Sequence, residues 1–196
     1  MESVRTESQS RRSVYLPERL RPLIAPRSVA VVGVSERSAG FGSRAALNLV
    51  DAGWTGTLYA VNPKYDEVHG ISCLPRVSDL PAPVDCLVVA VASSEVRAVV
   101  TEALEAGRAR SVLIFSSGLA ETGDDGFHVE RALGHLAHDY GVPISGPNTA
   151  GVFNFVDGTI LSFVQHMDAG RAGGGPVAVV SQSTGIGVGL AHARER

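Results

Sequence analysis

The stretch SVAVVGVSERSAGFGSRAALNLVDAGWTGTLYAVNPK, residues 28–64, decides the fold of this chain. Its apolar run at 28–34 is typical of a strand buried on both faces of a parallel sheet. A loop rich in glycine and serine follows at 35–43, then a helical stretch at 44–52 and a second apolar strand at 57–61. Small residues allow the loop's backbone N–H groups to approach an anion at the positive end of the following helix. This strand–loop–helix–strand unit therefore predicts phosphate binding.

The glycine loop departs from the dinucleotide fingerprint G-x-G-x-x-G, because Gly33 is followed by glycines only at Gly40 and Gly42. A NAD site also needs an Asp or Glu about 20 residues further on, which accepts from the ribose 2′-OH. The segment 62–64, Asn-Pro-Lys, occupies that place. A cation there favours a ligand with a phosphate on its ribose, as in NADP (2′) or coenzyme A (3′). The alternative is a solvated Lys64 in a turn.

The composition is that of a packed globular chain: of 196 residues, 44% are apolar and 19% are charged. This argues against wholesale disorder. The formal net charge of −3 gives no electrostatic reason to propose a nucleic-acid partner. No apolar run reaches the roughly 18 residues that span a bilayer, and no signal peptide is recognised. We therefore expect no membrane partner and a cytoplasmic location. Cys73 and Cys86 are too few for a disulfide framework or a metal site.

Beyond residue 64 the chain alternates between strand and helix patterns. Strands are expected at 68–73, 84–91, 111–115 and 143–145, with helices following Ser93-Ser94-Glu95 and beginning at Asp124 or Asp125. This alternation predicts an α/β fold with a Rossmann-like, doubly wound parallel sheet. Right-handed crossovers bring the loops after the strands to one edge, where ligands bind near the switch in strand order. The loops expected to converge there are those at Ser35, Asn62, Ala92, Ser116 and Asn148.

Four segments divide the chain. Residues 1–15 are expected to be a disordered tail, 16–156 the Rossmann-like domain, and 157–175 a crossover with a glycine-rich linker and a strand at 159–164. Residues 176–196 begin a second unit with a strand at 176–180, the turn SQSTG and a helix from 186. One strand and one helix cannot bury both faces of a sheet, so this second unit is expected to be incomplete.

Several motifs agree in order and spacing with one known family. They are LIAPRSVAVVGVSER, GFGS, LYAVNPKYDEVHGI, VDCLVVAV, FSSGLAETG and ISGPNTAGVFN between residues 20 and 154, and then GPVAVVSQSTGIGVGLA. Together they resemble the CoA-binding domain of NDP-forming acyl-CoA synthetases, the acetate–CoA ligase (ADP-forming) type, related to the α subunit of succinyl-CoA ligase. The resemblance implies that residues 176–196 are the truncated start of a flavodoxin-like subdomain.

The resemblance also implies roles for individual residues. The glycine loop would wrap the CoA pyrophosphate through backbone N–H groups, Lys64 would pair with the phosphate on the CoA ribose, and Ser116 and Ser117 would contact the CoA arm. Ser93, at a helix start on the same edge, would border the adenine, although serine is common at helix caps and strand ends. The candidate coenzyme-binding residues are Gly33, Ser35, Arg37, Ser38, Gly40, Gly42, Ser43, Asn62, Pro63, Lys64, Ser93, Ser116 and Ser117.

The turn SQSTG at 181–185 admits two further interpretations. A serine hydrolase uses G-x-S-x-G, but Ser181 replaces the first glycine and only His192 follows as a base. In the resembled family the segment is usually SQSGG, and its helix points at the active-site phosphate. Thr184 replaces that glycine here, and a β-branched side chain would hinder the approach of the backbone to a phosphate.

The histidines offer no catalytic assignment. The family's phosphoryl-carrying histidine lies beyond the SQSGG segment, and the sequence ends before that position. His128, His135 and His138 are expected on a polar helix, where the i, i+3 pair lacks a third metal ligand placed by the sequence. We assign no catalytic and no metal-binding residue.

Three functional hypotheses follow. The first is the CoA-binding portion of an NDP-forming acyl-CoA synthetase, inactive alone, with the phosphohistidine segment and an ATP-grasp domain supplied by a partner subunit or by further domains. The second is a stand-alone CoA-binding module with a regulatory or scaffold role. The third is an NADP-dependent oxidoreductase domain, which would need a substrate domain with a positioned acid or base.

Overall fold

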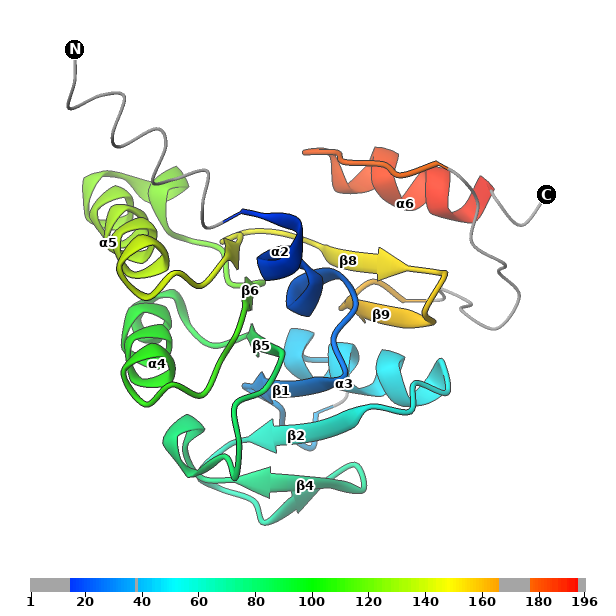
Figure 1. Cartoon of the computed structure of the whole chain (residues 1–196), viewed down its shortest axis with the longest axis horizontal. Coiled ribbons are helices and arrows are strands. Elements are labelled where there is room, and N and C mark those ends of the chain that lie inside the picture. The colour runs from blue at the N-terminus through cyan, green and yellow to red at the C-terminus, as the bar shows by residue number, and fades with distance from the viewer. Residues whose placement is uncertain (1–14, 38, 166–176, 194–196) are drawn as a thin grey trace.

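A seven-stranded sheet forms the centre of the computed structural model, which describes residues 15–37, 39–165 and 177–193 (Figure 1). The strands are β1 (Ser28–Val32), β2 (Thr57–Val61), β3 (Glu67–Val68), β4 (Ile71–Leu74), β5 (Cys86–Val89), β6 (Val112–Ile114) and β7 (Ile144–Ser145). All but the edge strand β3 run parallel, in the order β3-β4-β2-β1-β5-β6-β7. For the parallel strands this is the 3-2-1-4-5-6 order of a Rossmann fold. The predicted fold class is confirmed.

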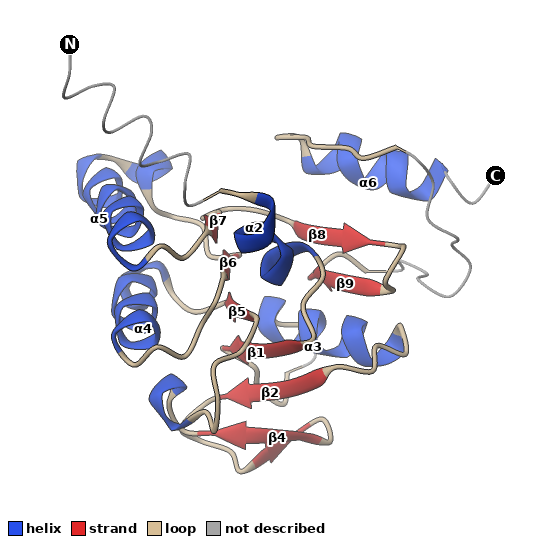
Figure 2. Ribbon diagram, in the orientation of Figure 1, coloured by secondary structure: helices blue, strands red, loops and turns tan. Residues whose placement is uncertain are grey.

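Helices cover both faces of the sheet, because its strands are apolar on both faces. Helix α3 (Phe41–Asp51) lies on one face, and α4 (Ser93–Glu105) and α5 (Asp124–Tyr140) lie on the other (Figure 2). Successive residues of β1 point to opposite faces, so the core forms two clusters, one on each side of the sheet. The α3 cluster includes Val29, Val31, Ala45, Ala46 and Leu49; the α4 cluster includes Ala30, Val32, Val96, Val100 and Leu104.

Helix α3 begins at Phe41, three residues before the predicted start at Arg44. Gly40 supplies the extended backbone of the N-cap, with φ −69° and ψ 147°, and its carbonyl accepts from the Arg44 N–H at 2.8 Å. Gly42 and Ser43 therefore belong to the first turn of the helix, and the glycine loop is the shorter segment 33–40. Helix α4 begins at Ser93, within the segment that was expected to precede it, and its N-cap Ala92 provides no side-chain cap hydrogen bond.

The segment after Lys64 contains a hairpin where the sequence suggested only one short strand. Its two-residue turn consists of His69 (φ 54°) and Gly70 (φ 75°), both with the positive φ that a type I′ turn requires. After the turn, β4 pairs in parallel with β2, with Cys73 beside Ala60. The hairpin therefore extends the sheet and brings the residues after β4 to the same edge as the glycine loop.

Two further structures were not predicted: the helix α2 (Pro17–Ile24) and the strand β8 (Gly151–Asn154). β8 pairs antiparallel with β9 (Thr159–Ser162), which lies within the strand predicted at 159–164. This hairpin covers α3, where Asn48 Nδ2 donates to the carbonyls of Ser162 at 2.7 Å and Val164 at 2.8 Å. Leu161 of β9 joins the α3 core cluster, so this two-stranded sheet packs on the α3 side of the large sheet.

The strand predicted at 176–180 does not form over residues 177–180, and Val177, Val179 and Val180 are each more than half exposed. A strand requires a neighbour to pair its backbone groups, and none in the described ranges adjoins this segment. Helix α6 (Thr184–Ala193) follows, and Ser183 Oγ accepts from the Ile186 N–H at its start. Nearly all of the predicted tail and most of the predicted linker (residues 1–14 and 166–176) lie outside the described residues. Within the described ranges no helix is both long and apolar enough to cross a bilayer.

Candidate functional site

The loops after the central strands meet at the carboxyl edge of the sheet, as predicted. Beyond β1, the Gly33 N–H donates to the Val61 carbonyl at 3.2 Å, and beyond β5 the Ala90 N–H donates to Val32 at 3.0 Å. β1 lies between β2 and β5. The strands that follow β1 in sequence first extend the sheet on the β2 side, and the chain then crosses over and extends it on the β5 side. This is the switch point at which ligands bind in open parallel sheets.

Two glycines are required by space: Gly33 at the start of the loop and Gly42 in the first turn of α3. Gly33 has φ +93°, and a Cβ built on it would lie 2.3 Å from the Ala90 carbonyl oxygen. A Cβ on Gly42 would lie 2.8 Å from the Gly33 carbonyl oxygen. The first turn of α3 therefore packs directly on the end of β1, and only backbone fits between them. Gly40 has no such restriction, since the nearest atom to its Cβ position is 3.6 Å away.

The loop is closed by a reciprocal pair of hydrogen bonds. The buried Ser43 hydroxyl donates to the Ser35 carbonyl at 2.8 Å and accepts from the Ser35 N–H at 3.0 Å. The Ser43 side chain and the Ser35 amide are therefore engaged within the protein. The groups left for an anion are the amides of the first turn of α3, which have no intrahelical partners. Gly40 has no side chain to cap them, and the turn contains no acidic residue.

The remaining loop residues add positive charge. Arg37 is exposed, and its carbonyl accepts from the Gly40 N–H at 3.2 Å. Ser38, a predicted site residue, lies outside the described residues. Arg44 follows in the first turn of α3, and its Nε is buried without a hydrogen-bond partner among the described residues. An unpaired buried donor in this turn fits a site built for an anion.

The end of β2 is tied to the glycine loop through Asn62. Its Nδ2 donates to the Val34 carbonyl at 2.8 Å, and its Oδ1 accepts from the Lys64 N–H at 3.0 Å. Asn62 therefore fixes the turn in which Pro63 and Lys64 stand, beside the loop that follows β1. The backbone of Lys64 is held in place while its side chain is exposed.

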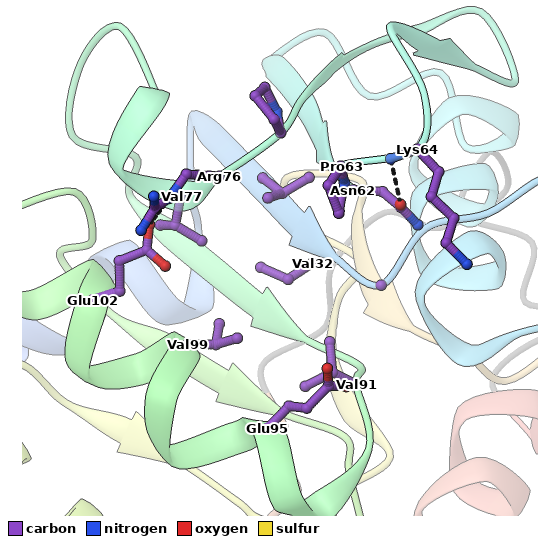
Figure 3. A pocket seen from close by; sticks show the side chains of 13 residues that line it. Val32, Asn62, Pro63, Lys64, Arg76, Val77, Val91, Glu95, Val99 and Glu102 are labelled. Carbon is purple, nitrogen blue, oxygen red and sulfur yellow. Dashed lines mark hydrogen bonds and ion pairs between the residues drawn. The ribbon is translucent and has the colours of Figure 1, made fainter.

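A groove of about 420 Å³ opens at this edge between β1, β2 and α4 (Figure 3). Valines line much of it, and Lys64 and Arg76 stand at opposite sides in the view of Figure 3. The lining residues are Val32, Gly33, Val61, Asn62, Pro63, Lys64, Pro75, Arg76, Val77, Val91, Glu95, Val99 and Glu102. The groove thus combines an apolar floor with a cation beside the glycine loop, which suits a flat ring attached to a phosphorylated sugar.

The wall of the groove opposite Lys64 is held by Glu102. Its Oε1 accepts from the Ser78 hydroxyl at 2.7 Å and the Ser78 N–H at 3.1 Å, and it lies 3.5 Å from Arg76 Nε. Partial burial raises the pKa of Glu102, but the Ser78 hydrogen bonds and the Arg76 charge outweigh this effect and hold the pKa below its ordinary value. The carboxylate therefore stays ionised and keeps Arg76 at the rim.

The predicted serines on the other side of the switch point do not line the groove. Ser116 is buried, and its hydroxyl donates at 2.7 Å to the carbonyl of Val91, a groove residue. Ser93 Oγ lies 3.6 Å from the place a Cβ on Gly118 would take, and Ser117 is exposed. The Ser116 proton is thus engaged internally, and a contact between these serines and a coenzyme stays a prediction.

Nine groove residues were not predicted, namely Val32, Val61, Pro75, Arg76, Val77, Val91, Glu95, Val99 and Glu102, and of these only Arg76, Glu95 and Glu102 carry a charge. A signal for Arg76 existed in the sequence ISCLPR, because recognising Ile71–Leu74 as a parallel strand would have placed residue 76 at the carboxyl edge. The two glutamates gave no signal, since exposed acids on a helix are ordinarily solvated. His69, which contacts the glycine loop, was also missed.

Neither metal chemistry nor a reactive thiol is indicated in the described residues. No group of three or more His, Cys, Asp and Glu side chains is placed to hold a metal ion there. Burial raises the pKa of the Cys86 thiol to about 12, and burial also raises the pKa of Cys73. Both cysteines are buried thiols rather than nucleophiles.

The sheet order, the tight glycine loop at the switch point and the groove beside it define a Rossmann-like coenzyme-binding domain. Residues 27–154 match the family described as CoA binding domain, and the chain belongs to this family. The family resemblance stated from the sequence is thereby confirmed.

Curated relatives identify the enzymes in which such a domain occurs. The chain is 36% identical over 172 residues to a trans-feruloyl-CoA synthase from an unknown prokaryotic organism, and 37% identical over 155 residues to an ADP-forming acetate–CoA ligase II of Archaeoglobus fulgidus. It is 32% identical over 167 residues to the alpha subunit of an ADP-forming acetate–CoA ligase II of Pyrococcus furiosus. These alignments cover 87%, 79% and 85% of this chain but only 24%, 23% and 35% of the relatives. The chain thus spans about a quarter to a third of their length.

Solved structures agree with this relationship. A Pyrococcus horikoshii protein matches with a TM-score of 0.79 and 30% identity, over 89% of this chain and 38% of its own. The dinucleotide forming acetyl-coenzyme A synthetase 1 of Candidatus Korarchaeum cryptofilum, in complex with phosphate and ADP, matches with a TM-score of 0.73 and 32% identity, over 89% and 36%. The domain is therefore homologous to the CoA-binding part of NDP-forming acyl-CoA synthetases.

Proposed function

We propose that this chain binds CoA in the groove at the carboxyl edge of the sheet and supplies the CoA site of an NDP-forming acyl-CoA synthetase. The observation that carries the proposal is the position of Lys64. It lines the groove directly after β2, where a NAD domain has a carboxylate, and Asn62 holds its backbone against the glycine loop.

The residues around the groove suit the parts of CoA. The uncapped first turn of α3 would accept the pyrophosphate, because its amides and the helix dipole favour an anion. Lys64 would pair with the 3′-phosphate, and the valines of the groove would enclose the adenine. Bound CoA would supply a thiol for acyl transfer, and we assign no catalytic side chain to this chain.

The reaction of such a synthetase converts an acyl-CoA, NDP and phosphate into the free acid, NTP and CoA. Relatives from Pyrococcus furiosus are named as alpha subunits, which supports a multi-subunit enzyme as the setting for this domain. We propose that an ATP-grasp partner subunit or domain supplies nucleotide chemistry, and that the protein acts in the cytoplasm. The alternative is a CoA-binding module with a regulatory or scaffold role, which would bind CoA equally well without such a partner.

Calorimetric titration with CoA, dephospho-CoA, NADPH and NAD tests the ligand. CoA should bind most tightly, and removal of its 3′-phosphate should weaken binding. Lys64→Ala should cost on the order of 1–3 kcal/mol for CoA, as expected for a charge-assisted phosphate contact, and almost nothing for dephospho-CoA. Arg131→Ala, which removes an exposed charge on α5, is the matched control and should bind CoA as the wild type does.

Two results would count against the proposal. Tighter binding of NADPH than of CoA would favour the oxidoreductase hypothesis. Equal losses for CoA and dephospho-CoA in Lys64→Ala would show that Lys64 does not recognise the 3′-phosphate. A pull-down that finds an ATP-grasp protein bound to the full chain would favour the synthetase over the stand-alone module.

A further inference from the structure

The turn of the β3–β4 hairpin reaches the glycine loop through one side chain. His69 Nε2 lies 2.8 Å from the Ser35 carbonyl oxygen. The contact joins segments 34 residues apart in sequence. Among the described residues, it is the one side-chain hydrogen bond between this hairpin and the glycine loop.

The chemistry of this contact fixes the donor. A carbonyl oxygen only accepts hydrogen bonds, so Nε2 of His69 must carry the proton. The same oxygen accepts from the Ser43 hydroxyl at 2.8 Å. The Ser35 carbonyl is therefore held from two sides, by the first turn of α3 and by the hairpin. Fixing this carbonyl fixes the peptide plane between Ser35 and residue 36, and with it the direction of the next N–H of the loop.

The backbone of His69 is unusual for a residue with a side chain. Its φ of 54° lies in the left-handed region, where type I′ turns ordinarily place Asn, Asp or Gly. A side chain kept at such a position points to a use beyond the turn itself. The hydrogen bond to Ser35 is the use that the structure shows.

We propose that His69 is a positioning residue of the coenzyme site: its Nε2–H holds the Ser35 carbonyl so that the loop keeps the conformation that receives the pyrophosphate. This inference rests on the proposed function, because it assumes that the glycine loop binds the pyrophosphate of CoA. His69 would therefore affect the binding of every ligand that carries a pyrophosphate, whereas Lys64 would affect only ligands that carry the 3′-phosphate.

Three variants separate the donor from the backbone. His69→Leu removes the donor, and His69→Gln keeps an N–H donor at about the position of Nε2; both retain a side chain at positive φ. His69→Gly removes the donor and also removes the steric cost of a side chain at positive φ, so it keeps the fold even if the leucine variant does not. Each variant of the full chain is titrated with CoA and with dephospho-CoA, and its melting temperature is measured.

His69→Leu and His69→Gly should weaken CoA and dephospho-CoA binding by the same factor, about tenfold for one lost hydrogen bond, while His69→Gln restores most of the affinity. In the wild type, a long-range ¹H–¹⁵N NMR spectrum should show a proton on Nε2 of His69. The inference is overturned if the leucine and glutamine variants bind alike, or if the loss is confined to CoA. If the wild type binds neither CoA nor dephospho-CoA, the proposed function itself fails. The wild-type titration therefore distinguishes this failure from a failure of the role assigned to His69.

Discussion

Gly33→Ala tests the close packing at the switch point, on which the groove depends. A Cβ at this position would lie 2.3 Å from the Ala90 carbonyl oxygen, whereas carbon and oxygen in contact are about 3.3 Å apart. The ends of β1 and β5 must therefore separate by about 1 Å. The separation weakens the hydrogen bond from the Ala90 N–H to the Val32 carbonyl. Because Gly33 itself must shift, it also weakens the bond from the Gly33 N–H to the Val61 carbonyl of β2, and each bond contributes about 1 kcal/mol. The φ of +93° adds about 1–2 kcal/mol for a residue with a Cβ.

The expected loss for Gly33→Ala is thus about 3–4 kcal/mol in the free energy of unfolding. Gly53→Ala is the matched control, because Gly53 also has a positive φ of 68° but nothing lies within 4 Å of its Cβ position. It should cost only about 1 kcal/mol. Urea unfolding at unchanged m-value measures both. Equal losses in the two variants would refute the argument, since they would show that the approach of Ala90 adds nothing to the cost.

Three further results are expected. The folded-state pKa of Glu102 is lowered, so its carboxylate stabilises the fold above the unfolded-state pKa, and this stabilisation is lost as the pH falls through the folded-state pKa. Glu102→Gln should therefore flatten the acid side of a profile of melting temperature against pH. Parallel profiles for the variant and the wild type would contradict this. With a pKa of about 12, Cys86 has about one thiolate in ten thousand at pH 8, so a thiol reagent should label it only on unfolding; labelling of native protein at the rate of a free cysteine would contradict its burial. Ser43→Ala should leave the Ser35 N–H unpaired and cost about 1–3 kcal/mol in urea unfolding, whereas an unchanged midpoint would mean that water replaces the hydroxyl.

Local patterns in the sequence were sufficient for the parts of the fold that depend on neighbouring residues. The apolar runs of β1, β2 and β5 and the helical spacing of apolar residues in α4 are local signals, so the doubly wound sheet could be predicted from them. The glycine loop and Lys64 could be placed at one edge because right-handed crossovers between parallel strands bring the loops that follow the strands to the same edge. The helix start at Phe41 was missed because Gly40 caps α3 through its backbone, for which the sequence gives only a weak signal.

Contacts between distant segments were decided by the tertiary structure. The sequence determined a Rossmann-like domain with a loop for an anion and a cation after the second strand, because these features are local. It could not show that β4 joins the sheet beside β2, because pairing in parallel depends on a neighbour far along the chain rather than on the strand's own residues. From that pairing come Arg76 at the rim of the groove and His69 against Ser35. Residues 177–180, part of the strand expected at 176–180, show the converse: an apolar run becomes a strand only when another strand shares its hydrogen bonds, and none in the described ranges adjoins them.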